Sequence, residues 1–395
     1  MKILIIDEDI NRVGGVERVI CTLANRLSEN HEVTVISEYK SSATPFYNYD
    51  KNIELKYLIN NSMNKTGKMN SKNVKYYLYR AIEKIKSFVY LRKRIKTLFS
   101  DYKNVDIIIF GRVFVALDFF PILKKNKEMT VIVRDAIHIK YYSEKVKKKM
   151  LKYFPKMVNY FIVSSDESIN EYKRFFDTDT LNLVKIYNPI GIKPNIAYNL
   201  KNKTIVSIGR MDSQKGYDSL IRSFAYIHQL HPDWNLKLYG NGNYEKYLQK
   251  LIDDLTLTTC VEILPSIKNV VEIFNKSSIF VLPSRYEGYA NVLVEAMSCG
   301  MPCVSYNWLM GVEEIIEDGK NGFVVYLQNR NDYFNGIYSE KDVKNLAKKI
   351  NYMIDNPKVC QKISKEAVKI IESRQLEKII NEWLKLIDYD ENKKR

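Results

Sequence analysis

Apolar and polar positions in the first half of the chain follow two spacings, one typical of buried strands and one typical of helices. Short apolar runs predict strands at 2–6, 32–37, 53–58, 105–110, 130–134 and 160–164. Between the first two runs, apolar residues three and four positions apart predict one face of a helix: Val16, Val19, Ile20, Leu23 and Leu27. A strand, a helix and a second strand in this order form a βαβ unit, which begins a parallel sheet.

A second series of the same kind follows a polar stretch from Tyr187 to Lys203. Strands are predicted at 204–208, 236–239, 261–264, 279–282 and 303–306, with helices at 217–228, 244–255, 270–275 and 289–299. Strand and helix alternate in both series, which indicates the α/β class with two doubly wound domains. We expect a first domain at 1–190 and a second at 191–370. A C-terminal amphipathic helix and tail at 371–395 is expected to pack back toward the first domain.

Composition places the chain among soluble globular proteins, with 46% hydrophobic and 27% charged residues. The opening apolar run meets Asp7 too early for a secretory signal, and the longest apolar stretch contains Arg112 and Asp118, so no membrane span is predicted. Scattered cysteines without C-x-x-C spacing indicate free thiols in a reducing compartment. We expect a cytoplasmic protein that attaches peripherally to the inner face of the cell membrane.

Positive charge is concentrated in the first half of the chain. Residues 1–200 carry a balance of +14 within a total of +16. Lysine and arginine gather at 65–98 and 140–156, interleaved with tyrosine and phenylalanine. Cations mixed with aromatic side chains suit an anionic membrane surface and a lipid diphosphate. Nucleic acid is the less favoured partner, because no nucleic-acid-binding motif accompanies the charge.

Two acidic residues flank the start of the helix predicted after the strand at 279–282. Glu287 precedes this helix, and Glu295 lies about two turns inside it. The carboxyl end of a parallel strand followed by a helix N-terminus is where α/β sheets bind ligands, phosphates in particular. Carboxylates eight residues apart cannot act as a close acid–base pair. We therefore expect them to hold different parts of one extended ligand.

Two other strand–loop–helix junctions combine glycine with charge. The loop 209–216 follows a predicted strand and carries Arg210 and Lys215, and a forked guanidinium beside a lysine suits a diphosphate. Near the N-terminus, Gly14-Gly15 allows the backbone to approach a ligand closely. Each feature alone is usually a turn or a solvated charge. Their joint placement after strands favours a binding site.

Together these motifs resemble those of the retaining glycosyltransferases of family 4, which have the GT-B fold of two Rossmann-like domains facing each other across a cleft. The resemblance runs along nearly the whole chain. Its elements are Gly14-Gly15, Asn188-Pro189, Gly209-Arg210…Lys215-Gly216 and Glu287…Glu295, of which the last two are the specific ones. The closing segment 382–387 also looks like the tail of bacterial members that extend lipid-linked oligosaccharides.

This resemblance implies metal-independent transfer of a hexose or N-acetylhexosamine from a nucleoside diphosphate sugar, for which UDP is our expectation. The acceptor would be a lipid-linked or other glycan in the assembly of a bacterial surface polysaccharide such as a capsule or O-antigen. Arg210 and Lys215 would neutralise the diphosphate as charge develops on the leaving group. Glu295 would hold the ribose, and Glu287 would contact the donor sugar.

Several further residues receive roles from the same resemblance. Glycines of the donor site would be Gly15, Gly209 and Gly240, and backbone N–H groups would come from Gly288, Tyr289, Ala290 and Asn291. Many members have a histidine on the acceptor side after a first-domain strand. Here His138 lies within a residue or two of that place, so it is a candidate catalytic residue.

Other chemistries fit the sequence less well. Asp-x-Asp occurs at 7–9, 177–179 and 388–390, but not where a metal-dependent transferase would place it, so we expect no catalytic metal and no cofactor besides the donor. Gly240 and Gly242 lack the third glycine of a nicotinamide fingerprint. The alternative function is a catalytically silent sugar-nucleotide or nucleic-acid binding protein of the same fold. The presence of all four charged motif residues favours an enzyme.

Overall fold

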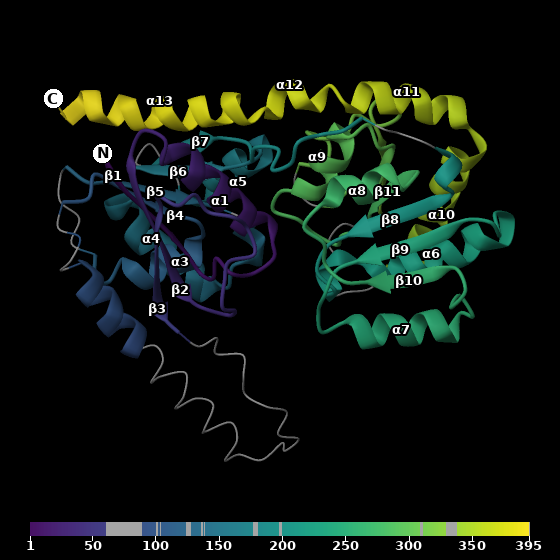
Figure 1. The fold of residues 1–395 in the computed structure, drawn as a ribbon, viewed down its shortest axis with the longest axis horizontal. Helices are drawn as coiled ribbons and strands as arrows, with labels where there is room; N and C mark the ends of the chain where they lie inside the picture. Colours follow the sequence, from purple (N-terminus) through teal and green to yellow (C-terminus); the bar gives the residue numbers. More distant parts are fainter. Residues whose placement is uncertain are drawn as a thin grey trace, which may run out of the picture. The chain divides into compact units, whose positions relative to one another are not determined.

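The chain folds into two compact units (Figure 1). The computed structural model describes residues 1–60, 89–99, 102, 104–123, 128–135, 137, 139–176, 181–196, 200–308, 311–328 and 338–394, with 388–394 as backbone only. The first unit comprises Met1–Ser164, Ser168–Ile186 and Ile380–Arg395, and the second comprises Ser165–Glu167 and Tyr187–Ile379. The C-terminal segment from Ile380 therefore belongs to the same unit as the N-terminus.

Seven parallel strands form the sheet of the first unit, in the order β3-β2-β1-β4-β5-β6-β7. They are β1 (Lys2–Asp7), β2 (Glu32–Tyr39), β3 (Glu54–Ile59), β4 (Ile107–Phe110), β5 (Thr130–Arg134), β6 (Tyr160–Val163) and β7 (Asn182–Lys185). The order reverses at β1, which pairs with β2 on one side and β4 on the other. The loops after β1 and β4 therefore leave the sheet at its topological switch point.

Helices of the first unit bury their apolar faces. They are α1 (Gly15–Leu27), a helix over 89–99, α3 (Val113–Phe119), η1 (Ile139–Tyr141), α4 (Glu144–Met157) and α5 (Asp166–Phe176). On α1, the predicted face is buried at Val19, Ile20, Leu23 and Leu27. The last helix, α13 (Leu376–Lys394), is buried within this unit at Ile380, Trp383 and Ile387.

The second unit has a six-stranded parallel sheet in the order β10-β9-β8-β11-β12-β13. Its strands are β8 (Thr204–Ile208), β9 (Asn235–Tyr239), β10 (Val261–Leu264), β11 (Ile279–Leu282), β12 (Cys303–Tyr306) and β13 (Phe323–Val325). Its helices are η2 (Leu200–Asn202), η3 (Ser213–Lys215), α6 (Tyr217–Leu230), α7 (Glu245–Asp254), α8 (Val270–Asn275), α9 (Asn291–Ser298), α10 (Glu340–Asp355), α11 (Pro357–Ala367) and α12 (Ile370–Arg374).

Both faces of this second sheet are buried. Along β8, Ile205 packs with α6 and α10 on one face, whereas Val206 packs with α8 and α9 on the other. Along β11, Val281 and Phe280 alternate in the same way. A parallel sheet covered by helices on both faces requires such continuous apolar strands. The switch point lies between β8 and β11, which pair at Ile205 and Ile279.

The structure confirms the predicted α/β class with two parallel doubly wound domains. Two strands, β7 and β13, are missing from the sequence-based prediction. β7 is an edge strand whose residues are exposed or half-buried, and β13 has only three residues, so neither gives a strong apolar run. All five cysteines are buried and free of disulfides.

Candidate functional site

The two most specific sequence motifs lie on neighbouring loops at the switch point of the second sheet. We name residues 209–216, between β8 and α6, the β8 loop, and residues 283–290, between β11 and α9, the β11 loop. Because β8 and β11 are adjacent and parallel, their loops leave the same edge of the sheet. Both loops lead into helix N-termini that no side chain caps, which favours an anion at this position.

Lys215 and Glu287 form an ion pair that joins the two loops. The Lys215 Nζ lies 2.6 Å from Glu287 Oε1, and the two side chains are only 14% and 7% exposed. Ser284 donates its hydroxyl to the same carboxylate oxygen at 2.6 Å. Sequence reasoning missed Ser284, since a serine three residues before a glutamate gives no distinctive signal. A lysine held against a carboxylate in this way is fixed in place before any ligand arrives.

Arg210 presents its charge differently from Lys215. Its side chain is 63% exposed, lies 3.4 Å from Asp212, and donates to Gln214 Oε1 at 3.1 Å. Such an exposed guanidinium contributes little to stability and can turn toward an anion. The two predicted cations are therefore one half-buried, ion-paired lysine and one solvent-facing arginine on the same loop.

Two glycines are required by close backbone contacts at this edge of the sheet. Gly216 has a φ of 64°, and a Cβ there would lie 2.0 Å from the carbonyl oxygen of Pro283. At Gly240, a Cβ would lie 1.8 Å from the carbonyl oxygen of Gly209. Any larger residue would force these loops apart. The predicted glycines therefore serve the packing of one loop on another, whatever else they do.

Residues at the start of α9 contact the segment that enters the second unit. Asn188 donates to Asn291 Oδ1 at 2.9 Å, and Arg374 Nε donates to the Tyr289 hydroxyl at 2.7 Å. Tyr187 lies beneath Arg374, 3.2 Å from the guanidinium carbon to the ring centroid. Burial raises the pKa of Tyr289 to about 12, so this phenol stays protonated. The Tyr289 side chain is occupied by Arg374, which leaves its backbone for the predicted ligand role.

Glu295 lies further along α9 and is 3% exposed. It stands four residues beyond Asn291, about 6 Å along the helix axis. Glu295 therefore lies about one turn inside α9, whereas Glu287 lies in the β11 loop before this helix. Ala290 immediately precedes this helix as its N-cap residue.

An ionic cluster lies beside the glycine loop of the first unit and joins α1, β1 and the start of α3. Arg112, at the start of α3, lies 2.5 Å from Glu17 and 3.1 Å from Glu8. Its Nε is 3.3 Å from Asp7 at the end of β1. Burial raises the pKa of Asp7 to about 6, and the Arg112 charge acts in the opposite direction. Glu17 is therefore occupied within the fold, while Gly15 begins α1 beside it.

Some predicted features lie outside the described residues. These are His138, the basic stretch 65–88 and the Asp-x-Asp at 177–179. Among the residues that the structure describes, no group of three or more metal-binding side chains is present. No helix in the described ranges is long and apolar enough to cross a membrane.

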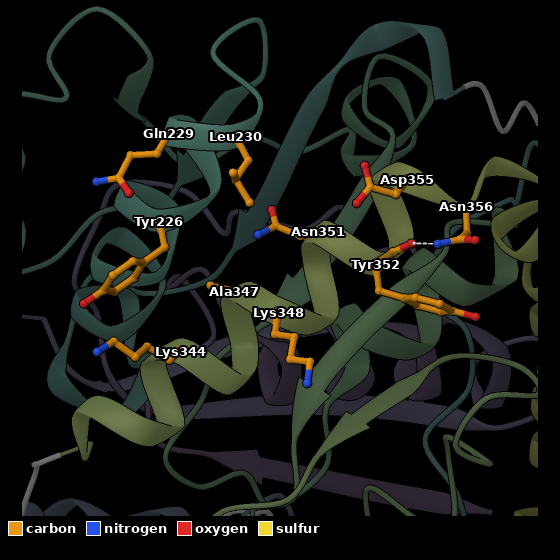
Figure 2. Close-up of a pocket in the computed structure, with 10 residues that line it drawn as sticks. All are labelled: Tyr226, Gln229, Leu230, Lys344, Ala347, Lys348, Asn351, Tyr352, Asp355 and Asn356. Carbon is orange, nitrogen blue, oxygen red and sulfur yellow. Dashed lines mark hydrogen bonds between the residues drawn. The ribbon is translucent and has the colours of Figure 1, made fainter.

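A groove elsewhere on the second unit is not part of this site. It lies between α6 and α10 and is lined by residues that include Tyr226, Leu230, Lys348 and Tyr352 (Figure 2). Tyr226 stands nine residues beyond Tyr217, about 13 Å along α6 from the β8 loop. Lys344, a second lysine of the groove, forms an ion pair with Glu340, with 3.0 Å between Nζ and Oε1. The residues that line the groove therefore take no part in the site formed by the β8 and β11 loops.

The second unit matches a known protein family. Residues 191–370 match the model of "Glycosyl transferases group 1". An uncharacterized glycosyltransferase of Haemophilus influenzae is 28% identical over 379 residues, covering 95% of this chain and 96% of the relative.

A relative and a solved structure extend the likeness over the whole chain. An α-1,4-N-acetyl-D-galactosaminyltransferase of Campylobacter jejuni, named for a GalNAc-GalNAc-diNAcBac-PP-undecaprenol substrate, is 23% identical and covers 98% of both chains. The crystal structure of S. aureus TarM, in a complex that includes UDP and α-GlcNAc-glycerol, superimposes with a TM-score of 0.76 at 15% identity. It covers 98% of this chain and 99% of TarM.

Proposed function

We propose that this chain, a GT-B glycosyltransferase with a glycosyl transferases group 1 domain at residues 191–370, moves a hexose or N-acetylhexosamine from a UDP-sugar to a glycan acceptor with retention of configuration. The observation that carries the proposal is the ion pair between Lys215 and the buried Glu287 at the switch point, with Arg210 on the same loop as Lys215. This edge of the sheet combines two cations with two helix N-termini, which together suit a diphosphate.

In the proposed reaction, the bond from the anomeric carbon to the diphosphate oxygen breaks and a bond to an acceptor hydroxyl oxygen forms. The hydroxyl proton is released, and UDP leaves with the bonding electrons. Lys215 and Arg210 stabilise the charge that develops on the diphosphate, and fixed cations do this without reorganising. Glu287 contacts the donor sugar, and Glu295 holds the ribose. The reaction uses no metal ion.

We further propose that the acceptor is a lipid-linked oligosaccharide in bacterial surface-glycan assembly. Support comes from the substrate in the name of the Campylobacter jejuni relative and from an amylovoran biosynthesis glycosyltransferase of Erwinia amylovora that is 26% identical over 362 residues. A polyprenyl-linked acceptor lies in a membrane, so the enzyme would work at an anionic membrane surface.

Exposed cations on the first unit support this membrane attachment. On α4, Met150 and Phe154 are buried, while exposed positions include Lys148, Leu151 and Lys152. The helix over 89–99 likewise exposes its basic residues Arg92, Lys93, Arg94 and Lys96. Burial raises the pKa of Asp118 on α3, and the charges of Lys149 and Arg92 act against this rise, so both helices lie near one carboxylate. Basic residues with exposed apolar side chains among them suit an anionic interface.

A screen of nucleotide sugars tests the proposed function. Purified protein is incubated with UDP-glucose, UDP-galactose, UDP-N-acetylglucosamine and UDP-N-acetylgalactosamine, with and without EDTA, and UDP release is measured. We expect release from at least one donor, undiminished by EDTA and lowered by on the order of 10²-fold or more in Lys215→Met. Activity that EDTA abolishes and a divalent ion restores would contradict the metal-independent reaction. Tight UDP binding without turnover of any donor, even with undecaprenyl-diphosphate-linked sugars added, would favour the silent binding protein.

A further inference from the structure

Arg285 lies in the β11 loop, two residues before Glu287, yet its side chain is directed at the β8 loop and α6. Its side chain is 2% exposed. Nη1 and Nη2 donate to the two carboxylate oxygens of Asp218, at 2.9 and 2.7 Å. Nη1 also donates to the carbonyl oxygen of Ser213 in the β8 loop. Both terminal nitrogens of the guanidinium therefore bond the neighbouring loop and helix.

Backbone and ring contacts reinforce this link on both sides. The Arg285 N–H donates to the Gln214 carbonyl at 2.8 Å, and Gln214 Nε2 donates to the Tyr286 carbonyl at 3.0 Å. The guanidinium lies 4.7 Å from the ring centroid of Tyr338, whose hydroxyl donates to Pro283 at 2.6 Å. Each of these contacts falls within two residues of Lys215 or within four of Glu287. The loops are consequently fixed to each other on either side of that ion pair.

We propose that Arg285 is a positioning residue, which through Asp218 and the β8 loop holds Lys215 and Glu287 in register for transfer without touching the substrate. This inference rests on the proposed function. A planar guanidinium can bond both carboxylate oxygens of Asp218 at once, whereas a lysine ammonium presents a single point charge. The inference therefore requires arginine, and lysine is expected to be an incomplete substitute.

The test compares three variants with the wild-type protein. Removing one partner of a buried pair leaves the other charge unpaired and endangers the fold, whereas replacing both by apolar residues usually preserves it. The main variant is therefore Arg285→Met with Asp218→Leu. Arg285→Lys is the conservative variant. Ile227→Ala, in the buried face of the same helix α6 but near its other end, controls for a loss of stability alone.

We expect kcat for UDP-sugar turnover to fall by on the order of 10²-fold in the double variant, because small displacements of catalytic groups have effects of this size. The KM for the UDP-sugar should change far less, since the variant removes no ligand contact. The kcat of Arg285→Lys should lie between those of the double variant and the wild-type protein. Ile227→Ala should lower the melting temperature and leave kcat near the wild-type value. An unchanged kcat in the double variant, or equal losses in the double variant and Ile227→Ala, would overturn the inference.

A second readout does not depend on turnover. Lys215 is 14% exposed in its ion pair, so an amine-acylating reagent should label it slowly, as peptide mass spectrometry can measure. Labelling of Lys215 should accelerate in the double variant and not in Ile227→Ala, and equal labelling in all proteins would again overturn the inference. If the wild-type protein turns over no UDP-sugar while this labelling difference appears, the proposed function fails and the positioning of Lys215 by Arg285 stands.

Discussion

Replacing Lys215 by methionine should affect both stability and turnover, because this half-buried lysine is the cationic partner of the buried Glu287. Lys215→Met keeps a long apolar stem but removes the charge 2.6 Å from Glu287. Glu287, itself 7% exposed on its side chain, then retains only the neutral Ser284 hydroxyl at 2.6 Å among the contacts described above. Removing one partner of a buried ion pair costs about 3–5 kcal/mol of unfolding free energy. Because the Ser284 hydroxyl still donates to the carboxylate, we expect a cost near the lower end of this range.

The expected loss is a large share of the stability of the second unit. At about 2–4 °C per kcal/mol for a domain of this size, a loss near 3 kcal/mol lowers the melting temperature by roughly 6–12 °C. Turnover should fall by on the order of 10²–10³-fold, the range for removing one fixed electrostatic stabiliser. Because Trp234 and Trp308 are buried in the second unit, tryptophan fluorescence reports its thermal unfolding.

The double variant Lys215→Met with Glu287→Gln separates the two effects. With both charges removed, no unpaired ion remains buried, so stability should return to within about 1 kcal/mol of the wild type. Turnover should stay low, since the cation is still missing. A double variant as unstable as Lys215→Met would refute the role of the unpaired carboxylate. A Lys215→Met protein with wild-type turnover would refute the assignment of the site.

Four further predictions follow from burial and charge. Arg210→Ala should lower UDP-sugar turnover by about 10²-fold with an unchanged melting temperature, because the arginine is exposed. Glu295→Ala should weaken UDP binding in calorimetry by about tenfold, the loss of one hydrogen-bonded charge. Replacing Lys148 and Lys152 together by glutamine should weaken co-sedimentation with anionic vesicles at low salt by about tenfold or more. Vesicle binding that these two substitutions leave unchanged would exclude this surface as the membrane contact. Since the folded pKa of Asp7, about 6, exceeds the ordinary value of 3.8, the stability of the first unit should fall as pH rises from about 4 to about 6. Asp7→Asn should flatten that slope in urea unfolding, followed by Trp383 fluorescence in a protein that also carries Trp234→Phe and Trp308→Phe.

The fold could be predicted because buried parallel strands are continuous apolar runs. The strands at 130–134, 204–208 and 279–282 occupy the predicted residues. Helix ends were less accurate: α9 begins at Asn291, where the sequence favoured Tyr289. The C-terminal helix extends to Lys394, beyond its apolar positions, because charged residues continue a helix as readily as they end it.

The location of the candidate site could also be predicted, but not its internal contacts. Glycine and charge after a strand mark the β8 and β11 loops in the sequence. The pairing of Lys215 with Glu287 spans 72 residues and depends on which strands are neighbours in the sheet, which no local pattern encodes. Arg285 was unnoticed for the same reason, since an arginine in a loop gives no sign that its partner, Asp218, lies on a distant helix.

The chain begins and completes its first unit at opposite ends of the sequence, and this has a consequence during synthesis. Residues 380–395 belong to the first unit, and Trp383 and Ile387 are buried. On the ribosome, all of the second unit is translated before these residues, whereas domains usually fold as they emerge, N-terminal first. The apolar surface that they cover therefore stays exposed through most of translation. The first unit, whose translation starts before that of the second, can therefore complete its core only after the second unit has been translated.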